Sequence, residues 1–163
     1  MSVLILCHGN ICRSPAAKAI MAQAGFEDTI SAGFKDKEGL KSPKKVRDYL
    51  NDNYGISLLD HRSQLVTEEM LRTAELILYM DGGQAVRIEA VWRRHGLDEV
   101  RGPWGNFCEP LARYLNTPGE KIGDPMFQKA GSDEFIAIME QLVEASRNFV
   151  QQRSESPIVA DVV

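Results

Sequence analysis

The sequence predicts an α/β protein whose parallel sheet is covered by helices on both faces, a three-layer doubly wound arrangement. Apolar runs of strand length occur at residues 2–7 and 76–80, and each leads through a short turn into a helical segment. Strands that alternate with helices form right-handed βαβ units. The length of 163 residues is typical of one domain and sufficient to bury a core without disulfides.

The first half of the chain contains two predicted strands and three predicted helices. The strand at 2–7 precedes a helix over residues 14–25, where Pro15 suits the first turn and Gly25 the end. Short apolar patterns and capping residues predict the remaining elements: a strand at 29–31, a loop at 33–42, a helix from Ser42-Pro43 to Gly55, and a short helix capped by Thr67.

The second half begins with the buried strand at 76–80 and a helix over residues 83–95 that Gly96 closes. A short strand is predicted at 98–101. Residues 102–131 hold four of the seven prolines and are predicted to be a long loop region. The last helix repeats apolar residues at spacings of three and four, at Phe135, Ile138, Met139, Leu142 and Phe149. We expect one domain over residues 1–151 and a frayed tail over 152–163.

Composition excludes several classes of protein. A net charge of −4 argues against general binding to nucleic acids or anionic membranes. Three cysteines are too few for a secreted disulfide framework, which favours a reducing compartment. The longest apolar runs have five residues, whereas a membrane helix needs about 20. No targeting signal is visible, so we expect a cytoplasmic protein without nucleic-acid or membrane partners.

The turn after the first strand carries the chemistry, since ligands of such sheets bind where strands end. It reads Cys7-His8-Gly9-Asn10-Ile11-Cys12-Arg13-Ser14-Pro15. The N–H groups of a curled loop from His8 to Ser14, together with a helix N-terminus, would bind an anion such as phosphate. Arg13 offers a planar fork for two phosphate oxygens.

At that positive centre the Cys7 thiol should ionise readily and become a nucleophile aimed at phosphorus. Gly9 and Asn10 tolerate the left-handed backbone of a tight loop, and the Ser14 hydroxyl can stabilise Cys7 as a leaving group. The alternative is that Cys7 is a small buried residue and Arg13 an ordinary helix-start arginine. The position of the motif directly after a buried strand favours catalysis.

The nonapeptide resembles the signature of the low molecular weight protein tyrosine phosphatases. Four further segments resemble family motifs in the same order: Ser31-Ala32-Gly33, Gly55-Ile56 followed by His61-Arg62, Met80-Asp81, and Asp124-Pro125. The resemblance implies a four-stranded parallel sheet, a phosphotyrosine protein or peptide as substrate, and a phosphocysteine intermediate, with no metal or cofactor.

The resemblance also implies roles for individual residues. Cys7 is the nucleophile, Arg13 binds the phosphoryl oxygens, and Asp124 acts first as general acid and then as base. Asn10, Ser31 and His61 match polar residues that hold the loop in its shape. Cys12 matches a second loop cysteine that can form a reversible disulfide with the nucleophile.

The substrate pocket departs from the family pattern. Met126 and Phe127 follow Asp124-Pro125 where two aromatic residues often stand, and Phe34 is the nearest aromatic candidate for the opposite wall. An arginine phosphatase of the same fold is an alternative, although Ile11 stands where those enzymes carry threonine. An arsenate reductase would need further cysteines near the third strand, and a non-catalytic phosphate-binding module is the remaining alternative.

Overall fold

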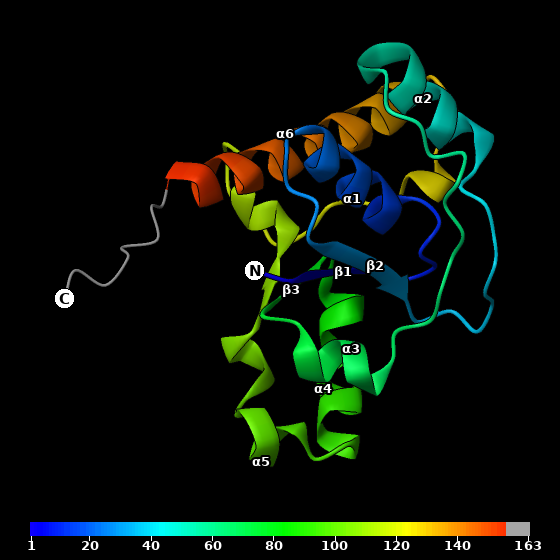
Figure 1. The fold of residues 1–163 in the computed structure, drawn as a ribbon. Helices are drawn as coiled ribbons and strands as arrows, with labels where there is room; N and C mark the ends of the chain where they lie inside the picture. Colours follow the sequence, from blue (N-terminus) through cyan, green and yellow to red (C-terminus); the bar gives the residue numbers. More distant parts are fainter. Residues whose placement is uncertain (156–163) are drawn as a thin grey trace.

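Four parallel strands form the centre of the structure, in the spatial order β2-β1-β3-β4. The computed structural model describes residues 1–155, and its strands are Val3–Cys7 (β1), Thr29–Gly33 (β2), Leu76–Tyr79 (β3) and Cys108–Pro110 (β4). Helices cover both faces of the sheet (Figure 1). The predicted α/β class and the four-stranded parallel sheet are therefore confirmed.

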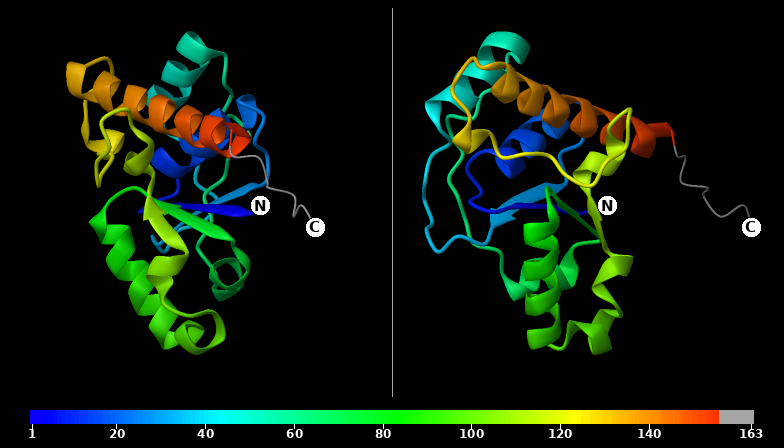
Figure 2. Two further views of the ribbon diagram at one scale, coloured as in Figure 1. Left: turned by 90° about the vertical axis from the view of Figure 1, so that its left-hand side faces the viewer. Right: turned by 180° about the vertical axis from the view of Figure 1, so that it is seen from behind.

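The helices divide into two layers, one on each side of the sheet, as Figures 1 and 2 show. One layer contains α1 (Arg13–Gln23), α2 (Lys44–Tyr54) and α6 (Asp133–Glu155). The other contains α3 (Glu68–Thr73), α4 (Gly82–Arg94) and α5 (Leu97–Arg101). Three short 3₁₀ turns complete the chain: η1 (Trp104–Asn106), η2 (Leu111–Tyr114) and η3 (Pro125–Phe127).

Strand β1 is buried on both faces, which explains its uninterrupted apolar sequence. Successive side chains of a strand point to opposite faces. Val3, Ile5 and Cys7 belong to the core beneath α1 and α6, whereas Leu4 and Leu6 belong to the core beneath α3 and α4. This strand therefore joins two hydrophobic cores.

Two predictions in the second half of the chain are wrong. Residues 98–101 are helical, within α5, and not a strand. Gly96 adopts a left-handed φ of 66° and turns the chain sharply, so that Leu97 is buried at the start of the helix. Strand β4 lies inside the predicted loop of 102–131, where its three residues and a terminal proline give no strand signal.

The final helix is longer than predicted. α6 continues to Glu155, so residues 152–155 belong to the helix and not to a frayed tail. The rest of the predicted tail, 156–163, lies outside the described residues. Phe149 and Val150 are buried near the end of α6 and hold this part of the helix against the core.

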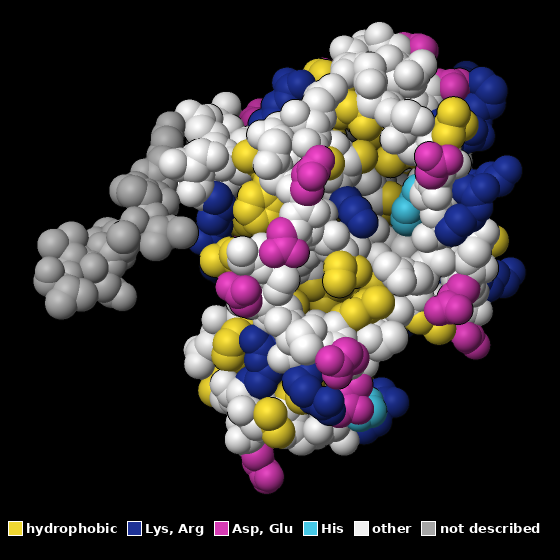
Figure 3. Space-filling view, in the orientation of Figure 1, with side chains coloured by type: hydrophobic (Ala, Val, Ile, Leu, Met, Phe, Trp, Pro, Cys, Tyr) yellow, Lys and Arg dark blue, Asp and Glu magenta, His cyan; other side chains and the backbone are white. Residues whose placement is uncertain are grey.

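The surface carries interspersed charges. On the face in Figure 3, lysine and arginine side chains gather over α2 and the segment that precedes it. No described helix combines the length and apolar character that a bilayer crossing requires.

The register of the sheet brings three strand ends together at one edge. Cys7 pairs with Gly33 on β2, and Leu6 pairs with Tyr79 on β3. At this edge Gly33 lies against the turn that follows β1. A Cβ atom at Gly33 would lie 2.8 Å from the Asn10 amide nitrogen and 2.9 Å from the His8 carbonyl oxygen. The close approach of two backbones therefore requires glycine.

We predict that Gly33→Ala lowers the free energy of unfolding by about 1–3 kcal/mol, the usual cost of overpacking. The clashing atoms belong to the backbone and cannot move aside as a flexible side chain does. Gly105→Ala is the matched control, since a Cβ there meets no heavy atom within 4 Å. Denaturant unfolding measures both variants, and equal stabilities would contradict the prediction.

Candidate active site

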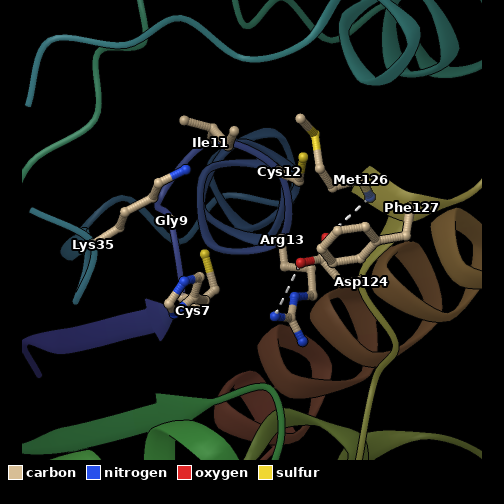
Figure 4. Close-up of a pocket in the computed structure, with 10 residues that line it drawn as sticks. Cys7, Gly9, Ile11, Cys12, Arg13, Lys35, Asp124, Met126 and Phe127 are labelled. Carbon is tan, nitrogen blue, oxygen red and sulfur yellow. Dashed lines mark hydrogen bonds and ion pairs between the residues drawn. The ribbon is translucent and has the colours of Figure 1, made fainter. Parts of the chain in front are cut away.

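A cavity of about 150 Å³ opens at this edge of the sheet, at the turn between β1 and α1. Three of its polar side chains come from different elements: Cys7 ends β1, Arg13 begins α1, and Asp124 precedes η3. Figure 4 shows Lys35 on one side of the cavity and Asp124, Met126 and Phe127 on the other. The full lining is Cys7, His8, Gly9, Ile11, Cys12, Arg13, Lys35, Asp124, Met126 and Phe127.

The N-terminus of α1 faces this cavity with its backbone donors free of side-chain caps. Cys12 is the N-cap residue and makes no capping hydrogen bond, and the first turn contains no acidic residue. The open N–H groups and the helix dipole favour an anion at this position. Anion binding by this turn stays a prediction, which the uncapped N-terminus of α1 supports.

The sulfur of Cys7 lies within hydrogen-bond distance of two groups, one in the turn and one in the first turn of α1. The Asn10 amide lies 3.2 Å from Sγ, and the Ser14 hydroxyl lies 3.0 Å from it. The Asn10 side-chain amide donates to Ser14 Oγ at 2.8 Å. When Cys7 is a thiolate its sulfur can only accept, so the Ser14 hydroxyl is then the donor. Two donors on one sulfur stabilise negative charge there.

Asn10 is the centre of the hydrogen-bond network that holds the turn. Its φ of 54° is the one left-handed non-glycine backbone among the described residues. Nδ2 donates to Ser14 Oγ and, at 3.1 Å, to Ser31 Oγ, while Oδ1 accepts from the Gln64 amide at 2.9 Å. The side chain is fully buried, so these bonds replace all its contacts with water.

His61 forms a hydrogen bond to the backbone of Asn10. Its Nε2 lies 2.6 Å from the Asn10 carbonyl oxygen, and a carbonyl only accepts, so Nε2 carries the proton that it donates. Burial lowers the pKa of His61, an effect that the bond to Asn10 opposes and the nearby Lys18 and Arg62 reinforce. The imidazole is therefore neutral at pH 7, with the proton on Nε2.

Arg13 is buried and held by groups from two distant segments. Its Nη1 donates to Asp81 Oδ2 at 2.6 Å and to the Ile122 carbonyl at 3.0 Å. Its Nη2 lies 3.6 Å from Asp124 Oδ2. The guanidinium thus connects the end of β3 with the loop that carries Asp124, and Arg13 is one of the residues that line the cavity (Figure 4).

The two carboxylate oxygens of Asp81 have different partners, one in helix α4 and one in the site. Oδ1 caps α4 by accepting from the Gly83 amide at 2.8 Å, while Oδ2 binds Arg13. Burial acts to raise the pKa of Asp81, but the hydrogen bond from Arg13 and the Gly83 amide outweigh it. The pKa lies below its ordinary value and the carboxylate stays charged.

Asp124 is presented by a short turn that Lys45 holds in place. Asp124 Oδ1 accepts from the Met126 amide at 3.0 Å and so caps η3. Lys45 of α2 donates to the carbonyl oxygens of Met126 at 2.8 Å and Gln128 at 2.6 Å. The loop is therefore attached to α2 through a single ammonium group.

The predicted position of Phe34 in the substrate pocket is wrong. Phe34 packs against the core beneath α3 and α4, with its ring 6.0 Å from the Arg87 guanidinium. Lys35, the next residue, lines the cavity in its place. The chain bends after β2, and the amides of both residues donate to the His8 carbonyl, at 2.8 Å from Phe34 and 3.0 Å from Lys35.

The structure thus brings Cys7, His8, Gly9, Ile11, Cys12, Arg13, Asp124, Met126 and Phe127 together around the cavity. Asn10, Ser14, Ser31 and His61 lie beneath or behind the turn. Sequence reasoning missed the roles of Gln64, Lys45, Asp81 and the Ile122 carbonyl. Asp81 carried a usable signal, since an acid directly after a buried parallel strand lies at the ligand-binding edge.

The fold and the site together are those of an α/β protein with a cysteine sulfur beside a helix N-terminus that suits a phosphate group. Comparison of the chain with known families gives a match over residues 2–156 to the low molecular weight phosphotyrosine protein phosphatases. The chain belongs to this family, as its motifs predicted.

Individual relatives agree with this assignment. The probable low molecular weight protein-tyrosine-phosphatase AmsI of Erwinia amylovora is 33% identical over 94% of this chain and 97% of its own length. The probable low molecular weight protein-tyrosine-phosphatase EpsP of Ralstonia nicotianae is 36% identical over 55% of this chain, a match that spans 61% of EpsP.

Solved structures show the same fold. The structure of the AmsI tyrosine phosphatase has a TM-score of 0.73 at 26% identity, covering 93% of this chain and 91% of that one. The YwlE arginine phosphatase from Geobacillus stearothermophilus has a TM-score of 0.76 at 23% identity, covering 94% of this chain and 93% of that one. At 23% identity the similarity to the YwlE arginine phosphatase shows a shared fold and does not extend to its substrate.

We predict that Lys45→Met loosens the loop that presents Asp124, because two hydrogen bonds from an ammonium group are lost while the apolar stem remains. The amides of Met126 and Gln128 should exchange with solvent about tenfold faster or more, as loss of a charged hydrogen bond permits. Lys44→Met is the control, since Lys44 pairs with Asp48 at 2.5 Å away from this loop. Equal exchange in both variants would contradict the assignment.

Proposed function

We propose that this protein hydrolyses phosphotyrosine in proteins or peptides, with Cys7 as nucleophile, Arg13 as phosphate ligand and Asp124 as general acid and base. One observation carries the proposal. Cys7 Sγ, with two hydrogen-bond donors, lies in the same 150 Å³ cavity as Asp124, and Arg13 lies 3.6 Å from that carboxylate. A nucleophile, an anion site and a proton donor are thus within reach of one phosphoryl group.

In the first step the Cys7 thiolate attacks phosphorus. The P–S bond forms as the bond to the tyrosine oxygen breaks, and protonated Asp124 gives its proton to that oxygen. Arg13 and the amides of the turn bind the equatorial phosphoryl oxygens, where charge spreads in the transition state. The buried ion pair with Asp81 fixes the orientation of Arg13 before substrate arrives.

In the second step a water molecule attacks the phosphocysteine and Asp124 accepts its proton. The P–O bond forms, the P–S bond breaks, and Cys7 leaves as thiolate. The Ser14 hydroxyl, 3.0 Å from the sulfur, stabilises the charge that returns to it. Asn10 orients this hydroxyl and supplies the second donor, which gives the network around Asn10 a role in both steps.

The walls of the cavity favour an aromatic phosphate ester. Ile11, Met126 and Phe127 supply apolar surface beside the phosphate site, and Phe127 is 83% exposed at its rim. Phosphoarginine is the alternative substrate, but its cationic guanidinium would lie near the ammonium of Lys35. Arsenate reduction is less favoured, since Cys108 lies in the core beneath α3 and α4 and lines no part of this cavity.

We also propose that the protein works in a reducing compartment such as the cytoplasm. Cys7, Cys12 and Cys108 are all free thiols, and none serves as a structural disulfide.

We predict that Cys7→Ser abolishes hydrolysis of an aryl phosphate in metal-free buffer. Turnover by Cys7→Ser would refute the role of Cys7 as nucleophile, and turnover of phosphoarginine alone would favour the alternative substrate.

We predict that Asp124→Asn lowers kcat by about 10²–10⁴-fold for esters with poor leaving groups, because only these need the proton. For esters of acidic phenols kcat should fall far less. Equal losses of kcat across leaving groups would refute the role of Asp124 as general acid.

We propose further that Cys12 protects Cys7 from irreversible oxidation. Peroxide converts the Cys7 thiolate to a sulfenic acid; the Cys12 sulfur then attacks, so that an S–S bond forms and water leaves. Burial, with the negative charges of Asp124 and Cys7, raises the pKa of Cys12 to about 12. Disulfide formation should therefore accelerate as pH rises, since the attacking group is the thiolate.

We predict that dithiothreitol restores activity to the peroxide-treated protein at least about fivefold more fully than to Cys12→Ser, because the disulfide is reducible and sulfinic acid is not. Cys108→Ser is the matched control and should recover like the unmodified protein, since Cys108 lies outside the cavity. Recovery of Cys12→Ser to the same extent would exclude this role.

A further inference from the structure

A second groove lies beside the site, between α4 and the segments that follow β2 and precede α3. We call it the α4 groove; it has a volume of about 300 Å³ and is lined by Phe34, Leu65, Val66, Arg87, Ala90, Val91 and Arg94. Four of these residues belong to α4 and are spaced three, one and three apart: Arg87, Ala90, Val91 and Arg94. They therefore form a single stripe on the helix. Apolar side chains form the middle of the stripe and an arginine lies at each end.

The two arginines of the α4 groove are exposed and form no ion pair with any carboxylate of residues 1–155. The Arg87 guanidinium lies over the ring of Phe34, 6.0 Å from its centroid. Arg93, their neighbour on α4, pairs with Glu89 at 2.7 Å. No acidic residue lines the α4 groove itself. The Glu38 carboxylate accepts from the Leu65 amide at 3.2 Å, and Asp81 and Asp124 line the adjoining hollow. The lining of the groove therefore carries two positive charges and is complementary to an acidic ligand.

The α4 groove is continuous with the catalytic cavity. A hollow of about 310 Å³ lies between them and shares Arg13, Asp124, His8 and Phe127 with the cavity. The same hollow shares Arg87 with the α4 groove. A chain whose phosphorylated residue occupies the cavity can therefore extend past Arg13 into the groove.

We propose that the α4 groove binds the part of the substrate polypeptide that flanks the phosphotyrosine. Acidic side chains of the substrate bind Arg87 and Arg94, and an apolar side chain between them packs on Leu65, Val66 and Val91. Phe34 serves here as the platform that orients Arg87. The inference rests on the proposed phosphatase function and specifies its substrate class as phosphotyrosine in an acidic and apolar sequence.

The test compares two phosphotyrosine peptides that differ only in charge. One carries aspartate and leucine around the phosphotyrosine, and the other carries asparagine in place of each aspartate. The measured quantity is the ratio of kcat/KM for the acidic peptide to that for the neutral one. Arg87→Gln with Arg94→Gln should lower this ratio about fivefold, the size expected of two exposed ion pairs. Added salt should lower the ratio of the unmodified protein in the same direction.

Arg93→Gln is the matched control, because it removes the same charge from α4 outside the groove. If the ratio is unchanged in the double variant, the α4 groove does not bind the flanking substrate polypeptide, while the phosphatase function remains intact. An equal fall in Arg93→Gln would also overturn binding by the α4 groove, since the effect would then come from net charge alone. Failure of the unmodified protein to hydrolyse both peptides and an aryl phosphate would instead reject the function on which the inference rests.

Discussion

The left-handed backbone at Asn10 is the constraint on which the rest of the site depends. A non-glycine residue with a φ of 54° is held there by the bonds of its side chain to Ser14, Ser31 and the Gln64 amide. With this conformation the Asn10 amide lies 3.2 Å from the Cys7 sulfur. Gly33 permits this shape, because a side chain at this position would displace the backbone of the turn.

Arg13 connects this turn to distant parts of the domain. Through Asp81 it joins the turn to the end of β3 and to the cap of α4, and through Asp124 to the loop before α6. The sheet register makes these contacts available, since β1 and β3 pair in parallel and end at the same edge. A buried guanidinium needs such partners, because an unpaired charge at this depth would cost several kcal/mol.

The surroundings of the phosphate site carry its selectivity. In the proposed function the turn binds phosphate through backbone groups, which distinguish little between phosphorylated substrates. The walls differ on each side: Lys35 is charged, while Met126 and Phe127 are apolar and attached to α2 through Lys45. Phe34, turned away from the cavity, contributes to the α4 groove instead.

The sequence by itself determined the turn between β1 and α1, because its nine residues are contiguous and bounded by a buried strand and a helix start. It also indicated β1 and β3, whose apolar runs reflect burial on both faces. The partners of Arg13 and the loop anchor Lys45 were decided by tertiary structure, since 68 residues separate Arg13 from Asp81 and 81 separate Lys45 from Met126. Strand β4, α5 and the orientation of Phe34 were decided in the same way. Their local patterns are short, and packing between distant elements selects the face to which each side chain points.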